Sequence, residues 1–177
     1  MRALILLLAF VACTGTTAAQ PVPEDWPVAA EADVASVDAI LAAVYDVISG
    51  PAGPRDWDRF KSLFRPEARL IPIASTPDGS FPMYWSPGEY AERASGWFAQ
   101  QGFFEVEIAR TMEQYGPMTH LFSTYESYDA ADAPEPFARG INSFQLFNDG
   151  DRWWVVNIYW QAETGALPIP DQYLPGG

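Results

Sequence analysis

Four long segments of alternating polarity fill the second half of the chain, and they constrain its fold more than any other feature. One turn, Tyr115-Gly116-Pro117, joins FFEVEIARTMEQ to MTHLFSTYESY, and a second turn, Asn148-Asp149-Gly150, joins FARGINSFQLF to RWWVVNIYWQAE. Alternation with a period of two, interrupted by turn residues, is typical of antiparallel hairpins. We therefore expect a four-stranded meander over residues 103–163, with an acidic loop at 129–136 between the hairpins.

Helical patterns precede the meander. Apolar residues recur at helical spacing over residues 36–48, where Ser36 can cap the first turn, and again over residues 56–65. Residues 86–101 begin with SPGE, which has the spacing of a capping box with proline at the first helical position. The sequence therefore predicts three helices before the long strands.

The order of these elements indicates the fold class. A short strand at 68–73 and a Pro/Gly loop at 74–82 separate the second and third helices. This is an α+β order, in which three N-terminal helices pack on a strongly curved antiparallel sheet. We expect one domain over residues 35–163, preceded by a flexible acidic, Pro-rich lead-in at 20–34 and followed by an extended tail at 164–177 that lies across the body.

The N-terminal residues have the pattern of a targeting segment. Arg2 precedes an apolar run at 3–12, and small residues precede Gln20, so residues 1–19 are predicted to be a signal peptide cleaved near Ala19. The expected location is periplasmic or secreted. The alternative is a lipoprotein anchored through Cys13.

Composition excludes several classes of function. Cys13 is the only cysteine and His120 the only histidine, so we expect no disulfide, no metal site and no cofactor. The chain has 10 basic and 23 acidic residues, a net charge of −13. This charge repels phosphate backbones and anionic lipid head groups, so we expect no nucleic-acid partner and no membrane partner apart from a lipid on Cys13.

Several segments resemble the nuclear transport factor 2-like superfamily, the cone-shaped fold that ketosteroid isomerases and SnoaL-like cyclases share. They are AVYDVISG, DWDRFKSLFRPEARLIP, the capped third helix and RGINSFQLFNDGDRWWVVNIYWQAE, within residues 35–163. The resemblance, which extends to a secreted branch, implies a cone-like α+β barrel with a central, mostly apolar pocket. It names no single activity, because this fold hosts enzymes, binding proteins and dimerisation modules.

The catalytic groups of the known enzymes are mostly missing. By resemblance, the helix tyrosine of ketosteroid isomerase corresponds to Tyr45 and its pocket tryptophan to Trp160, but its base falls near Pro72 and its strand acid on Ser143. Steroid-type enolisation is therefore not expected. A scytalone-type dehydratase uses two histidines, and this chain has one.

Strand parity assigns faces in the last hairpin. A two-residue turn at Asp149-Gly150 directs Arg139, Ser143 and Gln145 to the pocket together with Trp160, whereas a bulge at Gly150 would exchange the upstream set. The first register leaves an apolar outer face. We expect it to form a homodimer, or to be covered by Tyr173 and Leu174 of the tail; its residues are Phe144, Leu146, Trp153, Val155 and Tyr159.

Parity also assigns the earlier hairpin. A turn at Tyr115-Gly116 places Arg110, Ser123 and Tyr125 on the core face, and His120 on the opposite face with Glu105 and Glu107. A Ser-His-Asp set is therefore not expected.

The candidate pocket residues follow from these assignments, and no catalytic residue is assigned among them. They are Tyr45, Trp97, Arg110, Ser123, Tyr125, Arg139, Ser143, Gln145 and Trp160. The two arginines can instead form ion pairs with nearby acids. We expect an exported protein that binds a small, mostly apolar ligand. The alternatives are a SnoaL-like, isomerase- or dehydratase-type lyase for a carbonyl or polyketide-like substrate, and a non-catalytic homodimeric accessory module.

Overall fold

The computed structural model describes residues 21–177, so the expected signal peptide and Cys13 lie outside the described residues. The elements are α1 (Glu31–Val34), α2 (Val37–Ile48), α3 (Trp57–Ser62), β1 (Phe64–Thr76), β2 (Gly79–Pro82), α4 (Pro87–Phe98), β3 (Phe104–Tyr115), β4 (Met118–Tyr128), β5 (Ala138–Asn148), β6 (Trp153–Ala162) and a short 3-10 helix η1 (Asp171–Tyr173).

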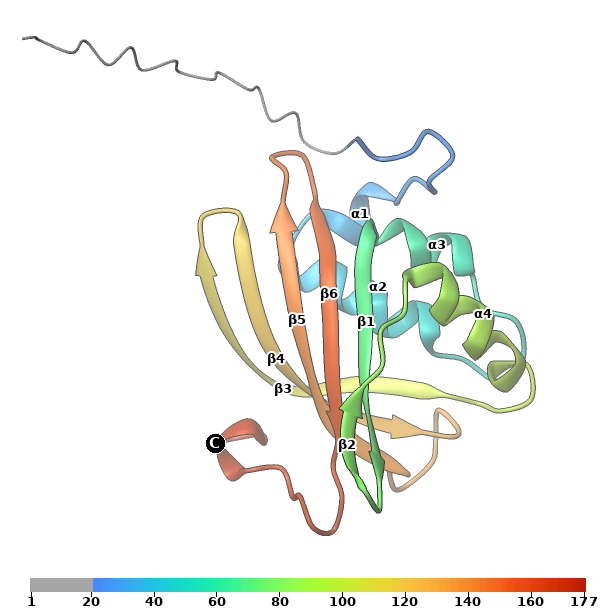
Figure 1. Cartoon of the computed structure of the whole chain (residues 1–177), viewed down its shortest axis with the longest axis vertical. Helices are drawn as coiled ribbons and strands as arrows, with labels where there is room; N and C mark the ends of the chain where they lie inside the picture. Colours follow the sequence, from blue (N-terminus) through green and yellow to red (C-terminus); the bar gives the residue numbers. More distant parts are fainter. Residues whose placement is uncertain (1–20) are drawn as a thin grey trace, which may run out of the picture.

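The six strands form one curved sheet in the order β2-β1-β6-β5-β4-β3, and the helices gather on its concave side (Figure 1). The predicted α+β cone is confirmed. Two details differ from expectation: β1 runs parallel to β6, whereas the other neighbours are antiparallel, and the sheet stays open between its edge strands β2 and β3.

Each of the three longer helices begins directly after a capping residue. The side chain of Ser36 accepts a hydrogen bond from the N–H of Ala39 at 3.0 Å, and Asp56 caps α3 in the same way. Ser86 and Glu89 form the complete capping box at the start of α4. All three predicted helices are therefore present, although α3 is shorter than expected because the chain enters the sheet at Leu63, whose carbonyl accepts from Val155 N–H at 2.9 Å.

Two segments are more regular than the sequence indicates. Within the expected lead-in, residues 31–34 form α1, Val34 is buried, and Trp26 Nε1 donates to the Phe64 carbonyl at 3.1 Å. Within the expected loop 74–82, β2 pairs with the end of β1 as a short hairpin. Both are short elements, and β2 pairs with the strand directly before it in the chain.

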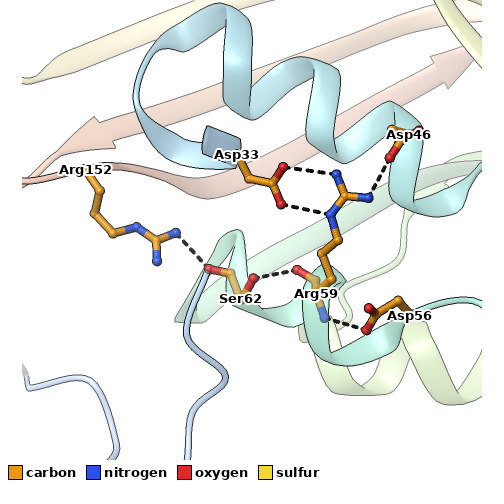
Figure 2. Close-up of polar contacts among 6 residues, drawn as sticks. All are labelled: Asp33, Asp46, Asp56, Arg59, Ser62 and Arg152. Atoms are coloured by element: carbon orange, nitrogen blue, oxygen red, sulfur yellow. Dashed lines mark hydrogen bonds and ion pairs between the residues drawn. The ribbon is translucent and has the colours of Figure 1, made fainter. Parts of the chain in front are cut away.

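Arg59 ties three helices together (Figure 2). From α3 its guanidinium donates to both carboxylate oxygens of Asp33 in α1, at 2.8 and 3.0 Å, and to Asp46 in α2 at 2.5 Å. These hydrogen bonds raise the pKa of Arg59 further above its ordinary value. Ser62 Oγ donates to the Arg59 carbonyl, and Arg152, directly before β6, donates to the Ser62 carbonyl, so the helical layer is also fixed to the start of β6.

We expect Arg59→Ala to lower the free energy of unfolding by about 1–2 kcal/mol, because it removes a two-pronged charged pair. The effect is limited because the side chain is 34% exposed. Lys61→Ala is the matched control. Within residues 21–177, Lys61 pairs only with the exposed Asp58, at 2.8 Å, so its loss should cost about 0.5 kcal/mol or less. Urea unfolding measures both; equal losses would contradict the role given to Arg59.

The predicted outer face needs correction. Phe144, Leu146, Trp153 and Val155 face the helices and are at most 8% exposed, and only Tyr159 of the five lies on the outer face, where it is 40% exposed. The cause is a bulge at Val156, which shifts the register of β6 against β5 between Gln145 and Leu146. The homodimer itself stays a prediction.

The C-terminal tail covers part of the outer face. Tyr173 packs its ring against Phe122 of β4 at 5.6 Å between centroids, and its carbonyl accepts from Thr124 Oγ1 at 2.6 Å. Ile169 is buried. The tail therefore lies against the outer face of the sheet.

Candidate functional site

A cavity of about 240 Å³ lies between the concave face of the sheet and helices α2 and α4. Eight of the sixteen described residues that line it are aromatic: Tyr45, Phe60, Tyr90, Phe103, Tyr125, Phe137, Phe144 and Trp160. Its polar lining side chains outside the tyrosines are Glu105, Ser127 and Asn142. Apolar walls with a few converging polar groups are the usual make-up of a small-molecule site.

A bulge in β3 determines which charges enter this cavity. Glu107 pairs with Tyr125 and Ala109 pairs with Thr124, so Ile108 has no partner of its own. N-terminal to the bulge, Glu105 and Glu107 turn to the concave face, whereas strict alternation predicted the opposite. That prediction was wrong because one extra residue reverses the facing of every residue upstream. The bulge lies in the long, strongly bent β3 (Figure 1).

Glu105 is the acidic group of the cavity. Ser127 Oγ donates to its Oε2 at 2.9 Å, and Asn142 Nδ2 lies 3.5 Å from its Oε1. Burial among the cavity walls raises the pKa of Glu105 to about 7, and the bonds from Ser127 and Asn142 offset only part of that rise. At neutral pH the carboxyl group is therefore divided between its protonated and ionised forms.

Tyr45 belongs to a hydrogen-bonded chain behind Glu105. Its hydroxyl lies 2.7 Å from Ser123 Oγ and accepts from Asn142 Nδ2 at 3.1 Å, while Ser123 donates to Glu107. Burial, and then the charge of Glu105, raise the pKa of Tyr45 well above its ordinary value. The hydroxyl is therefore a fixed, neutral member of the wall.

Two other tyrosines of the cavity wall have hydroxyl groups that remain available to a ligand. Within residues 21–177, neither Tyr90 nor Tyr125 forms a hydrogen bond through its hydroxyl. Burial, and then the charge of Glu105, raise the pKa of both phenols, so they stay protonated. Both tyrosines line the cavity with Glu105, so either hydroxyl group can donate to a ligand bound there.

The mouth of the cavity is aromatic. Phe137 is 56% exposed, and its ring lies 6.2 Å from that of Phe103, which in turn contacts Trp97 at 5.7 Å. Beside the mouth, Arg139 donates to both carboxylate oxygens of Glu163, at 2.8 and 3.2 Å. A ligand would therefore enter past an apolar rim. Arg139, the nearby arginine, is already paired with Glu163.

The structure brings together three of the nine candidate residues at the cavity wall, namely Tyr45, Tyr125 and Trp160. Ser123 lies directly behind, bonded to Tyr45. The remaining five do not line the cavity: Trp97, Arg110, Arg139, Ser143 and Gln145.

Physical reasons account for these five placements. The bulge at Val156 turns Ser143 and Gln145 to the outer face, where His120 Nε2 lies 3.1 Å from Ser143 Oγ. Arg110 bonds to Glu107 and Asp38, both at 2.6 Å. Arg139 pairs with Glu163, as the ion-pair alternative predicts, and Trp97 is 47% exposed at the rim.

Sequence reasoning missed Glu105, Asn142 and Tyr90 as site residues. Tyr90 lies in α4, which matches the predicted helix at residues 86–101, and Asn142 faces inward in the alternative register that a bulge produces. Glu105 gave no such signal, because the bulge at Ile108 has neither glycine nor proline to mark it.

The described part of the chain has no group of three or more His, Cys, Asp or Glu side chains placed to hold a metal ion. Within residues 21–177, no helix is both long and apolar enough to cross a bilayer.

No protein-family model and no curated protein matches the chain. Solved structures do resemble it. A protein with a cystatin-like fold from Caulobacter vibrioides matches with TM-score 0.55 and 11% identity over 77% of this chain and 93% of that one. An NTF-2-like protein from Silicibacter pomeroyi has TM-score 0.50 and 14% identity (73% and 94%), and a candidate ketosteroid isomerase from Parabacteroides distasonis has TM-score 0.50 and 10% identity (73% and 89%). The chain has the nuclear transport factor 2-like fold.

Proposed function

We propose that the protein binds a small, mostly apolar molecule in the cavity, with the polar end of that molecule at Glu105. The observation that carries the proposal is one carboxyl group, its pKa raised to about 7, facing an aromatic cavity of about 240 Å³. Titratable groups perturbed in this way collect at functional sites. The predicted signal peptide makes the periplasm or the outside of the cell the proposed location.

Acid–base chemistry is a second candidate, favoured by the hydroxyl groups of Tyr90 and Tyr125. A base with a pKa near neutrality can take a proton from carbon next to a carbonyl group, and phenols can donate to the oxygen that becomes negative. Glu105 would remove and return the proton, as in an isomerase or lyase. The likeness in fold to a candidate ketosteroid isomerase supports this chemistry only as an analogy. Glu105-dependent exchange of substrate hydrogen for deuterium would test it.

Ligand-induced thermal stabilisation tests binding itself. We expect at least one member of a panel of small apolar carbonyl, hydroxyl and amine compounds to raise Tm, since a ligand stabilises the state that binds it. Trp160→Ala should weaken this rise, because Trp160 is a cavity wall. Tyr159→Ala is the matched control, one position away on the outer face and 40% exposed, and should leave the rise unchanged.

The panel also decides between classes of function. If no compound in the panel raises Tm, the result would contradict the proposal. It would support the second alternative, a non-catalytic homodimeric accessory module. Equal effects of Trp160→Ala and Tyr159→Ala would place the bound compound outside the cavity.

A further inference from the structure

The cavity wall can carry negative charge but no positive charge. Among the described residues that line it, Glu105 is the only one with a carboxyl group and none is basic. The neighbouring arginines are already paired, Arg110 with Glu107 and Asp38, and Arg139 with Glu163. An anionic ligand would therefore enter without a counter-charge, at a large desolvation cost.

Aromatic residues line the cavity together with the carboxyl group of Glu105. The charge of Glu105 acts on the phenols of Tyr45, Tyr90 and Tyr125, which belong to three different elements. Tyr90 meets Trp160 edge to face, with centroids 6.4 Å apart. The face of an aromatic ring is its negative region, so these walls attract a cation as the carboxylate does.

We propose that the polar end of the ligand is a protonated amine, which pairs with the ionised form of Glu105 while its apolar body contacts the aromatic walls. This inference rests on the proposed binding function and adds the chemical class of the ligand. A carboxylate together with ring faces is the usual surrounding of an organic ammonium group, and the pair offsets the cost of removing both charges from water.

The size of the cavity limits the apolar body. A cavity of roughly 150 Å³ lined by aliphatic and aromatic side chains holds one benzene molecule. The larger volume here, about 240 Å³, fits a body of two fused rings. The net charge of −13 adds a long-range attraction for cations at low ionic strength.

Other titratable groups lie around Glu105, but the pH dependence of amine affinity is expected to come from Glu105. They are Tyr45 from α2, Tyr90 from α4, Glu107 from β3 and Tyr125 from β4, with Ser127 and Asn142 as neutral partners. The three phenols remain neutral because their pKa values are raised. Glu107 bonds to Arg110 and Ser123. Amine affinity should therefore rise as Glu105 ionises near pH 7.

Three compounds of matched shape test the inference: naphthylmethylamine, naphthylmethanol and naphthoate. Calorimetric titration at about pH 8 should give about tenfold tighter binding for the amine than for the alcohol, and no binding of naphthoate. At about pH 5.5 the preference for the amine should shrink, because Glu105 is protonated there. Glu105→Gln should remove the preference while the alcohol still binds. Glu113→Gln, which removes an exposed carboxylate from the same strand outside the cavity, should preserve it.

The outcomes separate this inference from the function it rests on. If the alcohol binds as tightly as the amine at about pH 8, or if the preference survives in Glu105→Gln, the inference of an amine ligand is contradicted. The proposed binding function is not affected by either result. If the three compounds and the whole thermal panel all fail to bind, the binding function falls with it.

Discussion

Glu105→Gln is expected to stabilise the protein by roughly 3 kcal/mol at about pH 8 and to change its stability little at about pH 4. The pKa of Glu105 is raised from 4.5 to about 7 by burial in the cavity. Above that value the folded protein must hold an ionised carboxylate among aromatic walls. Glutamine has nearly the same shape and no charge, so the variant avoids this cost.

The direction of the pH dependence follows from proton binding. Between pH 4.5 and about 7 the folded protein holds a proton on Glu105 that the unfolded chain has lost. Stability therefore falls as pH rises through this window and is constant, with respect to Glu105, outside it. The difference between wild type and Glu105→Gln should open over the same window.

Urea unfolding at several pH values measures the difference directly, because each variant is compared with wild type under the same conditions. Glu113→Gln is the control, since Glu113 is exposed on the same strand, and its curve should follow that of wild type. A Glu105→Gln variant that is less stable than wild type at about pH 8 would contradict a carboxyl group held in an apolar cavity.

Local signals in the sequence were sufficient for helices α2, α3 and α4 and for the four-stranded meander of β3 to β6. The caps at Ser36, Asp56 and Ser86 determine where three helices begin, and tight turns at Gly116 and Gly150 separate the long strands. These signals work because each depends on residues a few positions apart.

The side of the sheet to which each strand residue points could be predicted only in part. For β4, alternation places Ser123 and Tyr125 on the concave face, as the structure does. For β3 and β6, bulges at Ile108 and Val156 reverse the alternation partway along each strand. The β6 bulge lets Val155 and Ile158 both face the core, a packing result that no local pattern reveals.

Gly140→Ala is expected to lower the free energy of unfolding by about 3 kcal/mol. A Cβ atom at Gly140 would lie 2.5 Å from the Gln161 carbonyl oxygen and 2.4 Å from the Tyr125 hydroxyl oxygen. The carbonyl belongs to β6, which the sheet holds in place, so the cost cannot be avoided by a side-chain rotation. The displaced Tyr125 ring would also deform the cavity wall.

Gly96→Ala provides the control for glycine replacement. Gly96 is exposed within α4, and a Cβ atom there meets nothing within 4 Å, so alanine should stabilise the helix by about 0.5–1 kcal/mol. Tyr125→Phe combined with Gly140→Ala should recover only part of the loss, because the contact with Gln161 remains. Thermal unfolding of the four proteins measures these differences. A tolerated Gly140→Ala would mean that Tyr125 is not confined as described.

The side-chain carboxyl resonance of Glu105 tests the role of the cavity most directly. Carbon-13 NMR, with the resonance assigned by Glu105→Gln, should show it titrating near pH 7 in the free protein. With saturating naphthylmethylamine its pKa should fall, because the ammonium group stabilises the ionised form. A resonance that titrates near 4.5, the ordinary value for glutamate, and does not respond to the amine would contradict both the apolar surroundings of Glu105 and its contact with a ligand.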